Sequence, residues 1–221
     1  MNPSDKPANP PDKADKTNRL GALGLDPAHI VIEPLASHHD RAAFSCGEPS
    51  LDDYIKTKAK QDVKRQLTWC SILTPEVGAT RVLGYYTLSA HTIGLEELDE
   101  VSRNKLRAYP ALPAILVGRL AVDNRFQGAQ LDWLLMMHAL RTCLEISFQT
   151  ATMSVVVDAL HEKAADFYTD LGFMLLDNDS LRLHMPMGTV ASMFPTQASA
   201  LREKWGKPSN PYDVINAEQV S

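Results

Sequence analysis

The stretch that decides the fold is Gly118-Arg-Leu-Ala-Val-Asp-Asn-Arg-Phe-Gln-Gly-Ala-Gln-Leu-Asp-Trp-Leu-Leu135. Its first part ends the nearly continuous apolar run 114–122, which is typical of a central strand covered on both faces. Its last part opens the segment 131–147, which is apolar around much of its circumference and predicts a helix buried on more than one side. A strand that runs through a short turn into a helix points the first N–H groups of the helix outward. Together with the helix dipole, these groups favour an anion such as a phosphate.

The hydrophobic period changes repeatedly between two and 3.6 on either side of this unit. Two apolar runs separated by Pro75-Glu-Val-Gly78 predict a β-hairpin, and Ser50 is the expected N-cap of a helix that contains Leu51. The predicted strands cover residues 29–35, 68–73, 81–90, 114–122, 153–157 and 181–185, and the predicted helices cover 51–59, 96–107, 131–147 and 161–171. This order predicts a single α/β domain with a mixed, partly parallel sheet and helices on both faces.

The two ends of the chain differ from this domain in composition. Residues 1–25 hold four prolines among charged and polar residues, and we expect a disordered N-terminal tail. Residues 195–221 are expected to form a mostly irregular C-terminal extension with one helical turn near 198–205, which the following prolines stop. The folded domain is therefore expected to span residues 26–194.

Composition excludes several classes of protein. The 221 residues carry a formal net charge of −5, so an RNA contact would need a local basic patch rather than the overall field of the molecule. No apolar stretch approaches the roughly 18 residues that cross a bilayer, and the N-terminus lacks the apolar core of a signal peptide, so we expect a cytoplasmic protein with no membrane contact. The three cysteines are widely spaced, which favours buried thiols over a metal site.

Several motifs lie in one order along residues 30–194. They are Phe44-Ser-Cys-Gly47 with Leu51-Asp52, Gly84-Tyr-Tyr-Thr-Leu-Ser89, Gly118-Arg-Leu-Ala-Val-Asp123, Phe126-Gln-Gly128, Leu134-Leu135, Val156-Val-Asp-Ala159, Phe167-Tyr168 with Leu171-Gly-Phe173, and Leu183-His-Met-Pro-Met187. In this combination the chain resembles the Gcn5-related N-acetyltransferase (GNAT) superfamily. Within it, the chain is similar to the acetyltransferase toxins of bacterial type II toxin–antitoxin systems.

The resemblance implies a GNAT-like fold, with a twisted, mostly antiparallel sheet whose central parallel strands splay apart. It implies transfer of acetyl from acetyl-coenzyme A (acetyl-CoA) to a primary amine, in the toxins the α-amino group of an aminoacyl-tRNA, without a metal. Tyr168 would be the general acid for the departing thiolate, and the backbone of Leu120, Ala121 and Val122 would pair with the pantetheine arm. The residues that would hold the pyrophosphate are Gln127, Gly128, Ala129, Gln130, Leu131 and Asp132. The family also implies a ribbon-helix-helix antitoxin and a homodimer.

The residues themselves leave two roles open. Tyr168 shares the apolar face of its helix with Ala164 and Leu171, so spacing alone also fits a core tyrosine. Basic residues are frequent in the segment 51–65, where Lys56, Lys60, Lys64 and Arg65 are expected on one helix with Lys58 nearby. Such a run is either a solvated helix face or, as the densest basic cluster on an acidic body, a surface for tRNA.

The pyrophosphate loop departs from the superfamily pattern at two positions. Gln130 and Asp132 stand where two small residues are expected, and only Gly128 of the small residues remains. Small residues let phosphate oxygens approach backbone N–H groups closely, and a carboxylate at Asp132 would compete with that anion. Two hypotheses follow: an acetyltransferase whose Asp132 side chain turns away, or a catalytically impaired relative that keeps the scaffold and binds a partner.

Overall fold

One seven-stranded sheet forms the centre of the molecule. The computed structural model describes residues 20–98, 100–176 and 181–205. The strands are β1 (Val31–Pro34), β2 (Trp69–Thr74), β3 (Gly84–Gly94), β4 (Ala111–Val122), β5 (Ser154–Asp158), β6 (Met174–Leu175) and β7 (Arg182–Pro186). They lie in the order β1-β2-β3-β4-β5-β7-β6. The pair β4 and β5 is parallel and the other described pairs are antiparallel, which confirms the predicted mixed sheet with a parallel pair at its centre.

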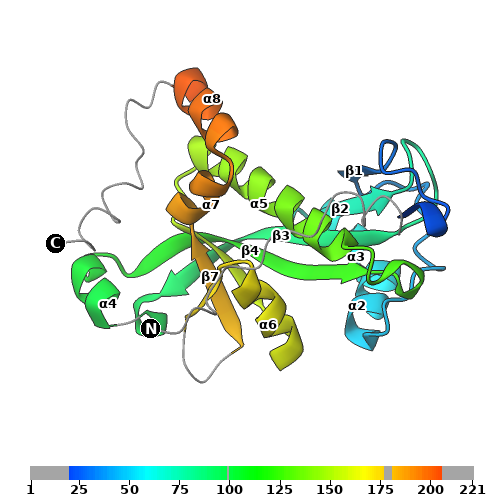
Figure 1. Cartoon of the computed structure of the whole chain (residues 1–221). Helices are drawn as coiled ribbons and strands as arrows, with labels where there is room; N and C mark the ends of the chain where they lie inside the picture. The colour runs from blue at the N-terminus through cyan, green and yellow to red at the C-terminus, as the bar shows by residue number, and fades with distance from the viewer. Residues whose placement is uncertain (1–19, 99, 177–180, 206–221) are drawn as a thin grey trace, which may run out of the picture.

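Helices cover both faces of this sheet. They are α2 (Pro49–Asp53), the π-helical turn η1 (Tyr54–Lys58), α3 (Ala59–Lys64), the 3-10 turn η2 (Leu95–Glu97), α4 (Glu100–Leu106), the 3-10 turn η3 (Asn124–Phe126), α5 (Leu131–Gln149), α6 (Glu162–Asp170), α7 (Met187–Met193) and α8 (Pro195–Trp205). Figure 1 shows α5 along one face of the sheet, with α7 and α8 beside its C-terminal end and α2 on the opposite side. Among the described ranges, no helix is both long and apolar enough to cross a membrane.

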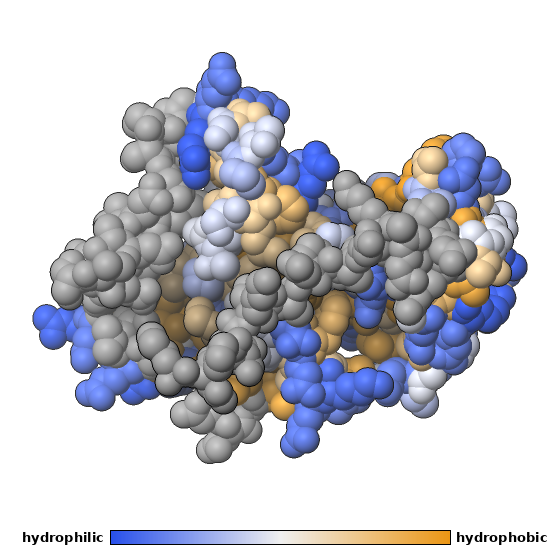
Figure 2. All heavy atoms as spheres, in the orientation of Figure 1, coloured by the Kyte–Doolittle hydropathy of each residue, from blue (hydrophilic) through white to orange (hydrophobic). Residues whose placement is uncertain are grey.

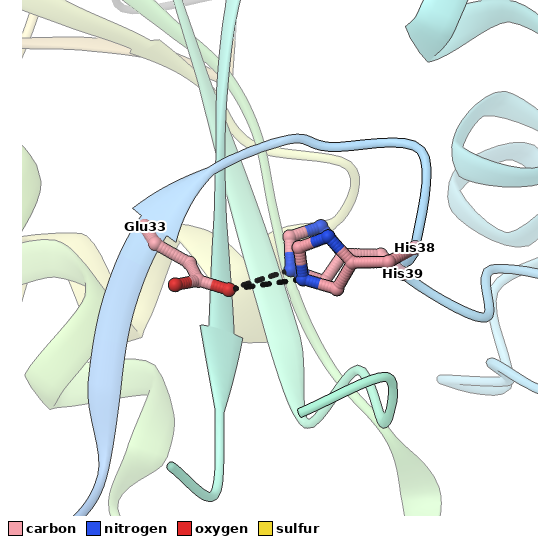
Figure 3. Close-up of side chains that lie close together, drawn as sticks. All are labelled: Glu33, His38 and His39. Carbon is pink, nitrogen blue, oxygen red and sulfur yellow. Dashed lines mark hydrogen bonds and ion pairs between the residues drawn. The ribbon is translucent and has the colours of Figure 1, made fainter. Parts of the chain in front are cut away.

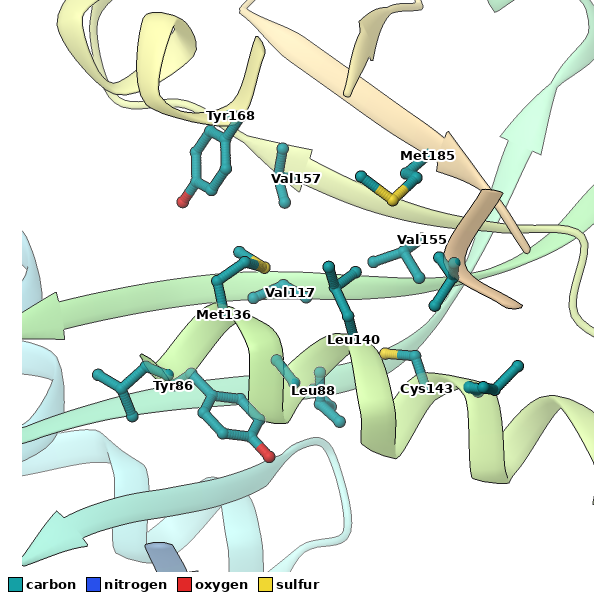
Figure 4. Close-up of a cluster of buried hydrophobic side chains, with 14 of the residues drawn as sticks. Tyr86, Leu88, Val117, Met136, Leu140, Cys143, Val155, Val157, Tyr168 and Met185 are labelled. Carbon is teal, nitrogen blue, oxygen red and sulfur yellow. The ribbon is translucent and has the colours of Figure 1, made fainter. Parts of the chain in front are cut away.

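The alternation of side chains along β3 divides the core between the two faces. Tyr86 and Leu88 belong to the main cluster, which packs against α5, and Figure 4 shows part of it. Tyr85 belongs to a second cluster under α2, η1 and α3, and Ile93 to a third one near α4. Because Tyr85 and Ile93 have the same parity in one strand, the second and third clusters lie on the same face of the sheet, opposite to α5.

Two predictions about the ends of the domain need correction. Leu20 and Leu25, assigned to the disordered tail, are buried in the main cluster, while residues 1–19 of that tail lie outside the described residues. At the other end, α8 is an 11-residue helix rather than one turn, and its Ala198 is buried in the same cluster. Both segments reach the core because their apolar side chains join a cluster most of whose members are remote in sequence.

Local elements differ from the prediction at two further places. The N-cap of α2 is Glu48 rather than Ser50, because Pro49 occupies the first helical position, where its missing N–H costs nothing. The short strand β6 and the helix α7 were not predicted.

Candidate active site

The central sheet opens beside the second half of β4. This strand pairs with β3 from Ala111 to Val122, whereas β5 pairs with it only from Ala114 to Val117. The next three residues, 118–120, are half exposed although β4 is central in the sheet. Figure 2 shows the surface hollowed between the regions of α6 and α2, with hydrophobic residues lining the hollow. Among the described strands, the edge of β4 that faces away from β3 therefore has no partner beyond Val117.

A β-bulge lies where the two strands separate. Thr87 is opposite Arg119 and Leu88 is opposite Val117, so Gly118 is the additional residue of β4. The bulge changes which residues face α5: Val117 does so before it and Val122 after it. Arg119 consequently points to the other face, together with Ala121, which packs in the cluster under α2 and η1.

Asp123 anchors the end of β4 to the Phe44-Ser-Cys-Gly47 motif. Its buried carboxylate accepts hydrogen bonds from the N–H of Ser45 (3.1 Å) and from the backbone N–H (3.0 Å) and Nε (2.7 Å) of Arg125. Burial opposes ionisation of this carboxyl, but the hydrogen bonds from Arg125 and Ser45 outweigh it and lower the pKa of Asp123. The motif is therefore an architectural clamp on the turn before α5.

Gln127 completes the clamp with its side chain. The amide nitrogen donates to the carbonyl of Cys46 (2.9 Å) and to that of Val122 (3.1 Å), so it is occupied within the protein. Asp52 accepts hydrogen bonds from the N–H of Cys46 (2.7 Å) and the hydroxyl of Ser45 (2.9 Å), which ties the motif to α2. These hydrogen bonds explain why Asp52 accompanies the Phe44-Ser-Cys-Gly47 motif in the sequence.

The N-terminus of α5 follows directly after this turn. Gly128 has a φ of 78°, and Ala129 and Leu131 are buried, so these residues set the path of the backbone. Gln130, the N-cap, has a left-handed φ of 60°, which a non-glycine residue adopts at a cost. Its Oε1 atom is buried without a hydrogen-bond partner among the described residues. Asp132 is exposed, and its carboxylate accepts the N–H of Trp133 at 2.9 Å.

Tyr168 lies beside the opening, on the face of the sheet that carries α5. Its ring packs edge-on against Phe167 and Phe173 and is 8% exposed. Burial raises the pKa of Tyr168 to about 12, so the hydroxyl stays protonated at physiological pH. Figure 4 shows this hydroxyl directed away from α6, toward the side of α5 and β4. Tyr168 is thus a core residue whose protonated hydroxyl points toward α5 and β4.

The two helices beside the opening are joined by a polar contact. His161, the N-cap of α6, accepts the N–H of Ala164 at Nδ1, and its Nε2 lies 3.6 Å from Oε1 of Glu48, the N-cap of α2. Both side chains are about half exposed. This contact links the part of the molecule that carries Tyr168 with the part that carries the clamp.

The predicted basic cluster forms a face of the α2-η1-α3 segment. Lys60, Lys64 and Arg65 are exposed and Lys56 is half-buried. Arg41 donates to the backbone carbonyl of Ile55 at 3.1 Å, which adds a positive charge beside this face. A cavity of about 80 Å³ lies there, lined by Leu35, Ala36, Ser37, Arg41, Lys60 and Val63.

A group of polar residues that the sequence analysis did not identify lies at β1 (Figure 3). The Nε2 atoms of His39 and His38 lie 2.9 Å and 3.5 Å from Oε1 of Glu33. The buried His39 also accepts the N–H of Ala36 at Nδ1, which places its proton on Nε2. A metal-ligating imidazole instead uses its second nitrogen as a donor, so this arrangement does not suit a metal ion. The hydrogen bond from His39 lowers the pKa of Glu33 and holds the loop after β1.

Comparisons with known proteins identify relatives of this chain by sequence and by structure. No family model matches the chain. The probable toxin TacT of Sinorhizobium fredii (strain NBRC 101917 / NGR234) is 29% identical over 174 residues, which cover 75% of this chain and 96% of that protein. The tRNA-acetylating toxin of Mycobacterium tuberculosis (strain ATCC 25618 / H37Rv) is 31% identical over 148 residues, which cover 67% of this chain and 86% of that toxin.

Solved structures of such toxins share the fold. AtaT complexed with acetyl-methionyl-tRNAfMet has a TM-score of 0.69 and 30% sequence identity, and the match covers 75% of this chain and 99% of that chain. A Tyr-to-Phe mutant of AtaT, bound to the C-terminus of the antitoxin AtaR and to acetyl-CoA, has a TM-score of 0.63 and 27% identity, covering 75% of this chain and 98% of that chain. With a curated relative at 31% identity over 86% of its length, the chain belongs to the GNAT acetyltransferase toxins of type II toxin–antitoxin systems.

Proposed function

We propose that this protein transfers the acetyl group of acetyl-CoA to the α-amino group of an aminoacyl-tRNA. The observation that carries the proposal is the opening between β4 and β5, where residues 118–122 lie along β3 on one edge but have no described strand partner on the other, with Tyr168 alongside. Membership of the acetyltransferase toxins and the complexes of AtaT with acetyl-methionyl-tRNAfMet and with acetyl-CoA support it.

The chain offers a fitting cradle for acetyl-CoA. The pantetheine arm would take the place of a paired strand along Leu120, Ala121 and Val122, and the turn 127–132 would receive the pyrophosphate at the N-terminus of α5. The carboxylate of Asp132 already accepts the N–H of Trp133 there. It must turn toward solvent when a diphosphate binds, and its exposed position permits this rotation.

The reaction needs alignment and charge stabilisation more than a strong base. An α-amino group titrates near 7.7–8.0, so a useful fraction is neutral at physiological pH. The amine nitrogen bonds to the thioester carbon, the carbon–sulfur bond breaks with its electron pair on sulfur, and the amine proton goes to water. The hydroxyl of Tyr168 donates a hydrogen bond or its proton to the departing sulfur and is reprotonated from solvent.

The basic face of α2, η1 and α3 is the proposed surface for the RNA. Lys60, Lys64 and Arg65 are exposed there on an otherwise acidic molecule, and Lys56 lies closer to the opening, two residues after the buried Tyr54. Such a basic cluster binds RNA phosphates through charge, and this contact does not depend on the sequence of the RNA. We also propose a ribbon-helix-helix antitoxin as a partner and a homodimer as the assembly, as in the family.

The decisive experiment measures transfer of labelled acetyl from acetyl-CoA to purified aminoacyl-tRNA. The expected product is N-acetyl-aminoacyl-tRNA, formed by the wild-type protein and at least 100-fold more slowly by Tyr168→Phe. Calorimetric titration with acetyl-CoA accompanies the assay. Absence of binding at millimolar acetyl-CoA would favour the catalytically impaired alternative and refute the proposal.

A further inference from the structure

Arg119 is the one charged side chain in the apolar strand β4, and it lies at the opening. The bulge at Gly118 turns it onto the face that carries α2 and η1. Its guanidinium carbon lies 3.6 Å from the centroid of the Tyr54 ring, close enough for stacking and a cation–π contact. Tyr54 is 3% exposed and sits in the π-helical turn η1, so the ring is a fixed platform for the guanidinium.

The donors of this guanidinium are not used within the described part of the chain. There the side chain of Arg119 forms no hydrogen bond and no ion pair, and it is half exposed. Burial raises the pKa of Tyr54 and of Cys70 to about 12, and the positive charge of Arg119 partly offsets both shifts. A stacked guanidinium with free N–H donors suits a planar or tetrahedral oxyanion.

The cofactor does not supply this anion. Its pyrophosphate would lie at the N-terminus of α5, and α5 covers the opposite face of the sheet. The face of Arg119 is instead continuous with η1, which carries Lys56 two residues after Tyr54, and then with the exposed basic residues of α3. An anion that reaches Arg119 from this side belongs to the molecule that follows the basic face.

We propose that Arg119, held flat against Tyr54, binds a backbone phosphate near the 3′ end of the acceptor RNA and thereby places the aminoacyl group in the gap between β4 and β5. This inference rests on the proposed function, because it assumes an RNA acceptor. It assigns Arg119 to the acceptor and not to the cofactor. The recognised chemistry is a phosphodiester, so the contact is independent of the base.

The test measures equilibrium binding of an uncharged tRNA to the full chain at several salt concentrations. Neutralising one phosphate of a single strand contributes about 0.7 to the slope of log K against log salt. We expect Arg119→Gln to weaken binding about tenfold at low salt and to reduce the slope by about 0.7. Arg119→Lys should keep the slope and lose only part of the affinity, because the charge remains and the planar fork is lost.

One control separates this contact from a change of overall charge. Arg141→Gln removes the same charge from α5, on the opposite face, and should leave affinity and slope near the wild-type values. An unchanged slope in Arg119→Gln, with or without lower affinity, would overturn the phosphate contact, as would equal effects of the Gln and Lys variants. Failure of the wild-type protein to acetylate aminoacyl-tRNA would instead refute the proposed function, whatever the binding slopes.

Discussion

Replacing Asp132 with asparagine tests how the N-terminus of α5 receives a diphosphate. In the wild-type protein one carboxylate oxygen accepts the N–H of Trp133 at 2.9 Å, so the anion and the side chain compete for the same donor. A unit charge about 5 Å from the diphosphate costs about 3 kcal/mol at an effective dielectric constant near 20. Because Asp132 is exposed, rotation and solvent screening reduce this to about 1.4 kcal/mol. We therefore expect Asp132→Asn to bind acetyl-CoA about tenfold more tightly at low salt.

Calorimetric titration with acetyl-CoA at about 20 mM and about 300 mM salt measures this effect. The advantage of Asp132→Asn should shrink at the higher concentration, because an exposed charge is screened there. Glu203→Gln is the matched control, since it removes a negative charge from an exposed position on α8, beside the other end of α5. A dissociation constant within twofold of the wild-type value at both salt concentrations would refute the reasoning and place the diphosphate elsewhere.

Three other features give measurable predictions. Tyr168→Phe should lower kcat about 100-fold with little change in acetyl-CoA affinity, and because the pKa of Tyr168 is about 12, wild-type kcat should not fall between pH 8 and about pH 10; undiminished turnover would remove Tyr168 from the reaction. Asp123→Ala should lower the free energy of unfolding in urea by about 2 kcal/mol, since the N–H of Ser45 loses its buried acceptor; a loss below about 0.5 kcal/mol would contradict the clamp. Burial raises the pKa of Cys46 to about 11 and of Cys70 and Cys143 to about 12, so stability should decline as pH rises from about 9 toward 12, and native thiols should react with iodoacetamide far more slowly than unfolded ones; rapid labelling of the native protein at pH 8 would disagree.

The centre of the fold was predictable because its elements are long and strongly patterned. The apolar run ending at Val122 and the helix beginning at Leu131 have the predicted types, and the helix continues to Gln149. The separation of β4 from β5 could not be predicted in the same way. It arises because β5 has five residues and β4 has twelve, and the sequence of β4 contains no information about the length of β5. The glycine at 118 was the available signal, since glycine inside a strand often marks a bulge.

The missed parts of the core depend on contacts that are remote in sequence. Leu20 and Leu25 stand in a stretch that is too polar to suggest burial, and they are buried because the main cluster offers them apolar partners. From the sequence, Arg119 was only one residue of the Gly118–Asp123 motif, because its stacking partner Tyr54 lies 65 residues earlier, in the π-helical turn η1. From the sequence, Ser45 and Cys46 were only part of a motif in the family resemblance. The hydrogen bonds to Asp123 and from Gln127 show that they hold the turn after β4.

The unequal lengths of β4 and β5 have a consequence for how this protein tolerates substitution. A ligand that docks along the free edge of β4 is recognised by main-chain amides and carbonyls, which every residue except proline supplies. Substitutions that change the size of Leu120 or Val122 would therefore alter the packing of the core and keep the main-chain groups that contact the ligand. Proline at either position is the exception, because it would remove an amide donor from the central strand, and neighbouring side chains cannot replace that donor.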